Sequence, residues 1–166
     1  PVGPAERAAR KRWFQRPAAI LAAAAAAAIL FIGGAFVGVS LAGNDAYQRQ
    51  QATALAAINA APDVQRASAD VSGGGTATLV WSGALGRSAL IATDLPELPS
   101  GKTYELWYIR DGQATAAGTM NATGGPDATW RVLTGRMAAG DTVGVTVEPR
   151  GGSKQPTTPP IVAIAS

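Results

Sequence analysis

The 166-residue chain contains neither histidine nor cysteine. This composition excludes the usual zinc, copper and iron sites, thiol catalysis and the common Ser/His or Cys/His relays. The formal net charge is +3, but five of the 14 basic residues precede residue 17, where they meet a single acidic residue. The positive charge therefore belongs to one short segment, and the rest of the chain is close to neutral.

Residues 1–17 form this basic segment, which is polar and too short to fold by itself. A cluster of basic residues, Arg10, Lys11 and Arg12, is typical of the cytoplasmic flank of a membrane span, because positive charge stays inside. A nucleic-acid-binding patch is the alternative. We expect a cytoplasmic juxtamembrane segment that ends an N-terminal domain missing from this chain, and no nucleic acid as a partner.

Residues 18–42 contain no charged residue, and as an α-helix these 25 residues would extend roughly 37 Å. A bilayer core is about 30 Å thick. A cleaved export signal ending at Ala42 is one alternative, but such signals carry only about 7–15 apolar residues. A buried core helix is another, but a chain this short cannot surround it. We expect one transmembrane helix, with a cytoplasmic N-terminus and an extracytoplasmic C-terminus.

The outer half of this predicted span is rich in small residues, namely Gly33, Gly34, Gly38 and Ser40. Glycine and serine lower helix propensity, and a helix must open before its peptide bonds can be cut. Gly34 and Gly38 also have the spacing of a helix-packing or dimer face. The sequence leaves both interpretations open.

Residues 43–62 follow the span and predict a helix that begins near Asp45 and stops before Pro62. Its large apolar side chains are few, and no heptad pattern is sustained, which argues against a coiled coil. We expect either a juxtamembrane helical stalk or a helix that rests on the following domain.

Residues 63–166 consist of short β-branched and aromatic runs separated by Gly, Pro, Asp and Ser. About eight strands in roughly 100 residues predict an extracytoplasmic antiparallel β-sandwich. The run "TYELWYIR" has large side chains on both faces, which predicts a central strand. Trp81, Trp107 and Trp130 are the expected core anchors. The predicted strands are 65–71, 76–82, 88–93, 103–110, 115–120, 129–133, 141–148 and 161–165.

A search for chemistry finds no catalytic, cofactor-binding or metal-ligating residue, and we expect no enzyme. The acidic pair Asp94 and Glu97 lies in a Pro-rich turn, which favours a solvated loop over a glycosidase site. The stretch "EPRGGSKQPTTPP" places Glu148, Arg150 and Lys154 in one Gly- and Pro-rich segment. This segment is either a candidate interaction loop or an ordinary solvated loop.

Two longer stretches, "LPELPSGKTYELWYIRDGQATAAGTM" and "GDTVGVTVEPRGGSKQPTTPPIV", follow the single predicted span. Together with that span they resemble the C-terminal region of the anti-sigma-K factor RskA family of bacterial membrane regulators, over most of residues 16–166. The resemblance implies a cytoplasmic anti-sigma domain that sequesters an extracytoplasmic-function sigma factor. It also implies one transmembrane helix and a folded extracytoplasmic sensor domain.

The same resemblance implies how the sigma factor is released. A site-one type protease trims the outer domain, and a site-two type protease then cuts the helix within the membrane. A competing hypothesis is a membrane-anchored extracytoplasmic binding module with no link to transcription, for which the loop containing Glu148 is the candidate surface. A small helical domain upstream of residue 1 in the full gene product favours the first hypothesis, and a start codon there favours the second.

Overall fold

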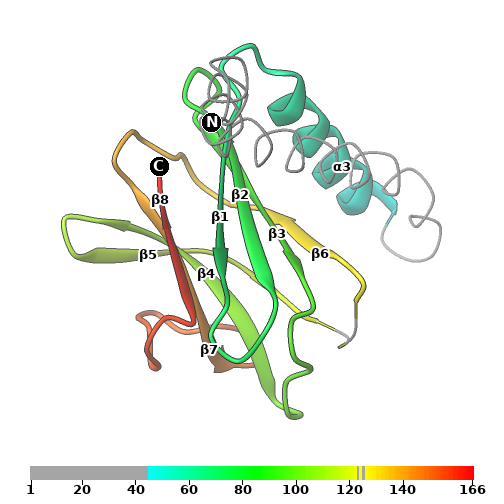
Figure 1. The fold of residues 1–166 in the computed structure, drawn as a ribbon, viewed down its shortest axis with the longest axis vertical. Helices are drawn as coiled ribbons and strands as arrows, with labels where there is room; N and C mark the ends of the chain where they lie inside the picture. The colour runs from blue at the N-terminus through cyan, green and yellow to red at the C-terminus, as the bar shows by residue number, and fades with distance from the viewer. Residues whose placement is uncertain (1–44, 123, 125) are drawn as a thin grey trace, which may run out of the picture. The chain divides into compact units, whose positions relative to one another are not determined.

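The computed structural model describes residues 45–122, 124 and 126–166. This part begins with helix α3 (Asp45–Ala60) and continues with eight strands (Figure 1). The helix predicted from Asp45 is therefore observed, and each predicted strand is observed with ends within two residues of the prediction. The strands are β1 (Gln65–Asp70), β2 (Thr76–Ser82), β3 (Arg87–Thr93), β4 (Lys102–Arg110), β5 (Gln113–Met120), β6 (Thr129–Val132), β7 (Thr142–Pro149) and β8 (Val162–Ala165).

The strands form two antiparallel sheets of four. The first sheet has the order β1-β2-β3-β6, and the second has the order β5-β4-β7-β8. Strands β2 and β3 form a hairpin, as do β4 and β5, where Asp111 and Gly112 both have positive φ, as the Asp-Gly pair predicts. Neither β3-β6 nor β4-β7 is a hairpin pair, so both sheets depend on pairing between segments distant in the sequence.

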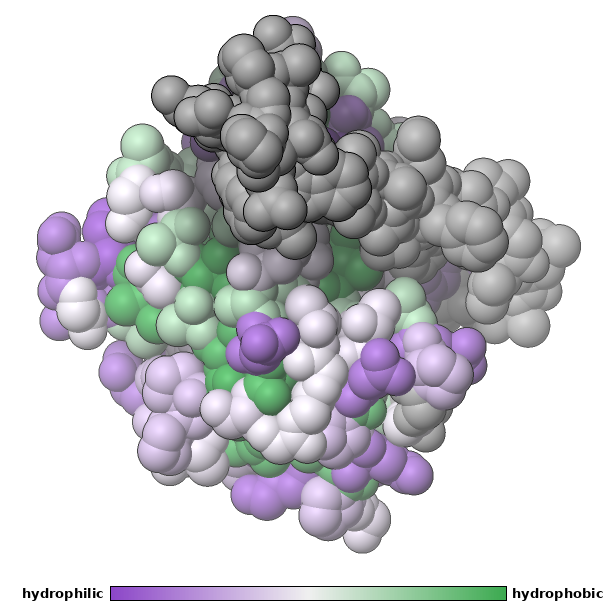
Figure 2. All heavy atoms as spheres, viewed as in Figure 1, coloured by the Kyte–Doolittle hydropathy of each residue, from purple (hydrophilic) through white to green (hydrophobic). Residues whose placement is uncertain are grey.

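The two sheets share one hydrophobic core between their inner faces. Leu79 and Trp81 of β2 face this core, as do Leu106 of β4 and Val145 of β7. Alternation along each strand, with a period of two residues, predicts this arrangement. Hydrophobic and hydrophilic residues are mixed on the face shown in Figure 2, as is normal for a folded domain.

The prediction that three tryptophans anchor the core is correct for Trp81 only. Trp107 is fully buried, but its position in β4 directs it to the outer face of the second sheet, where its Nε1 donates to Thr146 Oγ1 at 2.8 Å. Trp130 lies half-buried on β6, at the edge of the first sheet. The prediction that β4 is covered on both faces is confirmed, since Glu105 and Trp107 are buried on its outer side.

Helix α3 rests on the β domain, beside β3 and β6 of the first sheet (Figure 1). Its residues Leu55 and Ile58 are buried. The Gln51 Oε1 atom accepts a hydrogen bond of 3.0 Å from the Val132 backbone N–H on edge strand β6. An edge strand presents unpaired backbone groups, and this side chain satisfies one of them. Of the two predicted roles for this segment, the helix resting on the following domain is the one observed.

Within residues 45–122, 124 and 126–166, no helix has the length and apolar character needed to cross a membrane. The predicted span, residues 18–42, lies outside the described residues, together with the basic segment 1–17.

Candidate functional site

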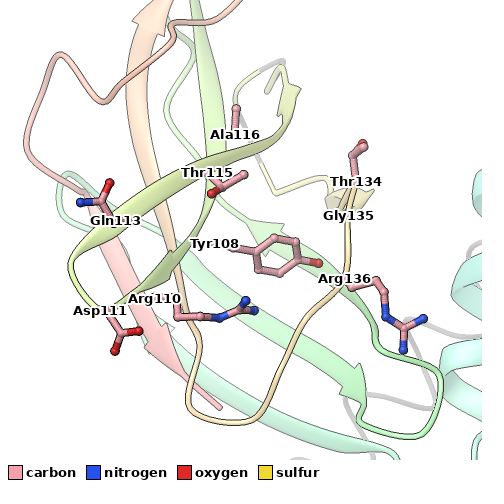
Figure 3. Close-up of a pocket in the computed structure, with 9 residues that line it drawn as sticks. All are labelled: Tyr108, Arg110, Asp111, Gln113, Thr115, Ala116, Thr134, Gly135 and Arg136. Atoms are coloured by element: carbon pink, nitrogen blue, oxygen red, sulfur yellow. The ribbon is translucent and has the colours of Figure 1, made fainter.

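A groove of about 470 Å³ opens beside the tip of the β4-β5 hairpin (Figure 3). Side chains of Tyr108, Arg110 and Thr115 reach toward it from the hairpin, and residues 134–136 form the opposite wall. Tyr108 and Thr115 are direct partners in the β4-β5 register, so they share the inner face of the sheet. The volume lies within the range of about 300–1,000 Å³ that is usual for ligand sites.

The Arg110 guanidinium is fixed by a two-point ion pair. Its Nε and Nη2 atoms donate to the two carboxylate oxygens of Asp141, both at 2.7 Å. The Asp141 side chain is 1% exposed and that of Arg110 is 56% exposed, so the carboxylate lies beneath and the cation faces solvent. Hydrogen bonding to Arg110 lowers the pKa of Asp141. The arrangement keeps both charges in place at the side of the groove.

The Arg136 side chain is exposed, and its guanidinium lies against the turn between β2 and β3. A Cβ atom added to Gly86 would lie 2.6 Å from its Nη2, and Gly86 has a φ of +60°. The backbone N–H of Met137 also donates to the Gly86 carbonyl at 3.1 Å. Gly86 is therefore required both by the turn and by the close approach of the arginine.

Tyr108 forms the floor of the groove. Its hydroxyl shares a hydrogen bond of 2.8 Å with Ser88 Oγ, which ties β4 to β3 across the core. Burial raises the pKa of Tyr108, although the Ser88 contact opposes this. The phenol is therefore neutral at physiological pH and acts as a fixed polar group.

The groove was not predicted from the sequence. Its walls come from residues 108–116 and 134–136, which are at least 18 residues apart in the sequence, and no local motif marks either one. The only local signal is that Arg110 ends a strand of otherwise buried residues and precedes the Asp-Gly turn.

The predicted interaction loop comprises residues 148–160. Residues 150–161, which follow β7, fold back over the outer face of the second sheet, and Glu148 fastens them there. Glu148 is fully buried. Its carboxylate accepts hydrogen bonds from Thr146 Oγ1 at 2.7 Å, Ser153 Oγ at 2.8 Å and the Thr157 backbone N–H at 2.9 Å, and from the Thr157 hydroxyl. Glu148 is thus an internal anchor and not part of an accessible surface.

The carboxylate of Glu148 keeps its charge despite its location. Burial raises its pKa, but the hydrogen bonds from Thr157, Thr146 and Ser153 outweigh burial and lower the pKa to about 2. Neighbouring Glu105 of β4 accepts one hydrogen bond, from the Ser153 backbone N–H at 2.7 Å. Burial and the nearby charge of Glu148 raise the pKa of Glu105. Ser153 therefore joins the loop to both carboxylates, one on each of two neighbouring strands.

The other two residues of the predicted interaction loop, Arg150 and Lys154, are exposed. The Arg150 backbone N–H donates to the Gly101 carbonyl at 2.8 Å, which fixes the start of the loop. These cationic side chains remain available to a partner, and an interaction role for the loop stays a prediction. Gly33, Gly34, Gly38 and Ser40 of the predicted span lie outside the described residues.

The described residues hold no group of three or more metal-ligating His, Cys, Asp or Glu side chains. Chemically, the groove can donate hydrogen bonds from the ion-paired guanidinium of Arg110, from the exposed guanidinium of Arg136 and from hydroxyls, and the loop can present cations. The architecture is that of a two-sheet antiparallel β domain with a helix docked against one sheet.

Comparison with known proteins identifies the family. The model of the family described as anti-sigma-K factor RskA, C-terminal, matches residues 20–161. The chain therefore belongs to the anti-sigma-K factor RskA family. The two motifs that carry the resemblance now have a structural meaning: "GKTYELW" contributes Glu105 and Trp107, and "VTVEPRGGSKQPT" contributes Thr146, Glu148 and the loop that covers them.

Three relatives illustrate the match. A Streptomyces griseus protein described as an uncharacterized protein in the phr 5′ region is 36% identical over 164 residues, covering 96% of this chain and 66% of the relative. The anti-sigma-K factor RskA of Mycobacterium sp. (strain KMS) is 35% identical over 153 residues, covering 92% and 59%. That of Mycolicibacterium vanbaalenii is 37% identical over 102 residues, covering 61% and 42%.

The chain thus spans between 42% and 66% of the length of these relatives. No solved structure matches it.

Proposed function

We propose that this chain is the transmembrane and extracytoplasmic sensor part of a membrane-bound anti-sigma factor that regulates an extracytoplasmic-function sigma factor. Membership of the RskA family and the names of the mycobacterial relatives support this assignment. The sigma factor binds to an N-terminal domain outside this chain. The protein is a single-pass protein of the cell membrane with its N-terminus in the cytoplasm, and it is not an enzyme.

The contact between α3 and β6 is the observation that carries the sensor role. Helix α3 follows directly after the predicted span, and it is held on the β domain by Gln51 and by buried Leu55 and Ile58. A rearrangement of the β domain therefore acts on the helix that leads into the membrane. A loop or a free helix at this position would transmit no such change.

Release of the sigma factor then proceeds by regulated intramembrane proteolysis. A signal outside the cell alters the β domain, a site-one type protease cuts within the extracytoplasmic part, and a site-two type protease cuts the span. Gly33, Gly34, Gly38 and Ser40 assist the second cut by weakening the helix.

Capture of the sigma factor tests the anti-sigma role. The full-length gene product and the 166-residue chain, each with the same C-terminal tag, are purified from membranes in detergent and their partners are identified by mass spectrometry. We expect the full-length protein to retain one sigma factor and the shorter chain to retain none. Absence of a sigma factor from both, with unchanged transcription after gene deletion, would contradict the anti-sigma role.

The groove beside the β4-β5 hairpin favours the second candidate, an anchored extracytoplasmic binding module without a link to transcription. Polar groups line this groove, and none of the described residues that line it belongs to α3. Unchanged transcription after gene deletion, as described above, would favour this second candidate.

A further inference from the structure

We propose that the groove lined by Tyr108, Arg110, Thr115 and Arg136 is a binding site for an oxyanion group, either a carboxylate or a phosphoryl group. The inference goes beyond the proposed sensor role, because binding is a property of this chain and can be measured without a sigma factor.

The groove offers hydrogen-bond donors that are already in position. Arg110 is held by its two bonds to Asp141, both at 2.7 Å, so that its Nη1 atom, which neither bond uses, remains free to donate. Arg136 is exposed, and its guanidinium lies against the turn at Gly86. Fixed guanidinium groups lose little side-chain entropy when an anion binds, and their planar array of donors suits carboxylate and phosphate oxygens.

The residues that line the groove carry one positive charge in excess, since Arg110 and Arg136 are cationic and Asp111 is anionic. Asp141 pairs with Arg110 from below, and its side chain is 1% exposed, so a ligand in the groove does not contact this carboxylate. Among residues 45–122, 124 and 126–166, no carboxylate lies within ion-pair distance of Arg136. Asp111 also lines the groove, but its side chain points away from Tyr108 and from the opposite wall (Figure 3). Arg136 therefore remains uncompensated.

Neutral hydroxyl groups complete the site. Thr115 is exposed on β5 and points into the groove, next to its register partner Tyr108 (Figure 3). The opposite wall approaches the Tyr108 ring closely, since a Cβ atom added to Gly135 would lie 3.5 Å from its Cε2. Burial raises the pKa of the phenol, so its oxygen carries no charge that would repel an anion. The site thus combines cations with neutral polar groups.

Titration of the full chain in detergent micelles tests this proposal. Nitrogen-15 NMR of the arginine Nε–H groups follows additions of sodium phosphate and of sodium acetate, with sodium chloride at matched ionic strength as the reference. The test variant is Arg136→Gln, which removes the uncompensated cation from an exposed position. The matched control is Arg150→Gln, the same change on an exposed arginine of the loop.

We expect phosphate or acetate, but not chloride, to shift the Arg110 and Arg136 signals in a saturable way. Arg136→Gln should weaken binding by about tenfold, which is typical of losing one charge-assisted hydrogen bond, and Arg150→Gln should leave it unchanged. Stronger binding of phosphate identifies a phosphoryl ligand, and stronger binding of acetate identifies a carboxylate. The proposal is overturned if chloride gives the same shifts, or if both variants bind like the wild type or weaken to the same extent.

Discussion

Replacing Glu148 by glutamine should release the loop 150–161 from the second sheet. The carboxylate accepts hydrogen bonds from Thr146, Ser153 and Thr157, and every one of these groups acts as a donor. Glutamine preserves the shape of the side chain but presents an NH₂ group on one side. On the side of the Thr157 backbone N–H, that group meets a donor that cannot accept. On the side of the Ser153 and Thr157 hydroxyls, it requires both hydroxyls to turn and accept, so in either orientation charge-assisted hydrogen bonds are lost.

The magnitude follows from the pKa of Glu148. One unit in a pKa corresponds to about 1.4 kcal/mol. Lowering the pKa of Glu148 from 4.5 to about 2 therefore makes its ionised form about 3 kcal/mol more favourable in the folded protein than in the unfolded chain. We expect Glu148→Gln to reduce the free energy of unfolding at pH 7 by about 3 kcal/mol.

The pH dependence provides a second signature. Because the folded-state pKa of Glu148 is depressed, its contribution is complete above about pH 5 and is lost as the pH falls toward 2. Wild-type stability should fall over this range more steeply than that of Glu148→Gln. Urea unfolding of the chain in detergent micelles, followed by tryptophan fluorescence at several pH values, measures both effects.

Glu105→Gln is the matched control, since it makes the same change on the same face of the sheet. The pKa of Glu105 is raised by burial, so its ionised form is disfavoured in the folded state and its contribution to stability falls as the pH rises through that pKa. Glutamine can still accept from Ser153. We expect a change within about 1 kcal/mol at pH 7. Equal losses for Glu105→Gln and Glu148→Gln would refute the assignment of Glu148 as the anchor.

Two further predictions concern backbone approach and the docked helix. Gly152→Ala should lower the free energy of unfolding by about 2–3 kcal/mol, because the added Cβ would lie 2.8 Å from a carboxylate oxygen of buried Glu105. Gly151→Ala is the control: an added Cβ there meets no atom within 4 Å, so the free energy of unfolding should fall by only about 1 kcal/mol in the same urea assay. Gln51→Ala removes the acceptor for the Val132 N–H and should speed amide hydrogen exchange in α3 by about fivefold. The control Gln50→Ala changes an exposed side chain and should leave the exchange rate as in the wild type. Equal exchange rates in the two variants would contradict the docking role.

The strands could be predicted because their signals are local. In "TATLVWS" and "DTVGVTVE" the side chains alternate with a period of two, and Gly-rich turns separate such runs. Their order in the sheets could not be predicted, because β3-β6 and β4-β7 pair across long sequence separations. Trp107 is a second example of a feature that the sequence predicts only in part. Alternation along the strand predicts that its side chain lies on the other face of the sheet from Tyr104 and Leu106, but its burial there is explained only by the loop 150–161.

The candidate site was predicted less completely than the fold. Glu148 lies two residues before Arg150 in the sequence, which suggested a charged surface loop. Glu148 is buried because the loop containing Ser153 and Thr157 folds back over the second sheet. No local sequence pattern predicts that the loop takes this path. The groove is built from the β4-β5 hairpin and residues 134–136, so it exists only after the sheets have formed.

We propose that the chain belongs to a membrane-spanning regulator whose proteolysis releases a sigma factor. The most direct measurement follows a tag at each end of the full-length gene product by immunoblot of cell fractions, with and without a site-two protease. Without the protease, we predict that an N-terminal fragment accumulates that ends beyond residue 42 and still contains the predicted span. With the protease, this fragment should be replaced by a shorter inner fragment that ends within residues 18–42. An intact membrane protein under every stress, or an outer tag released alone after Ala42, would contradict the account.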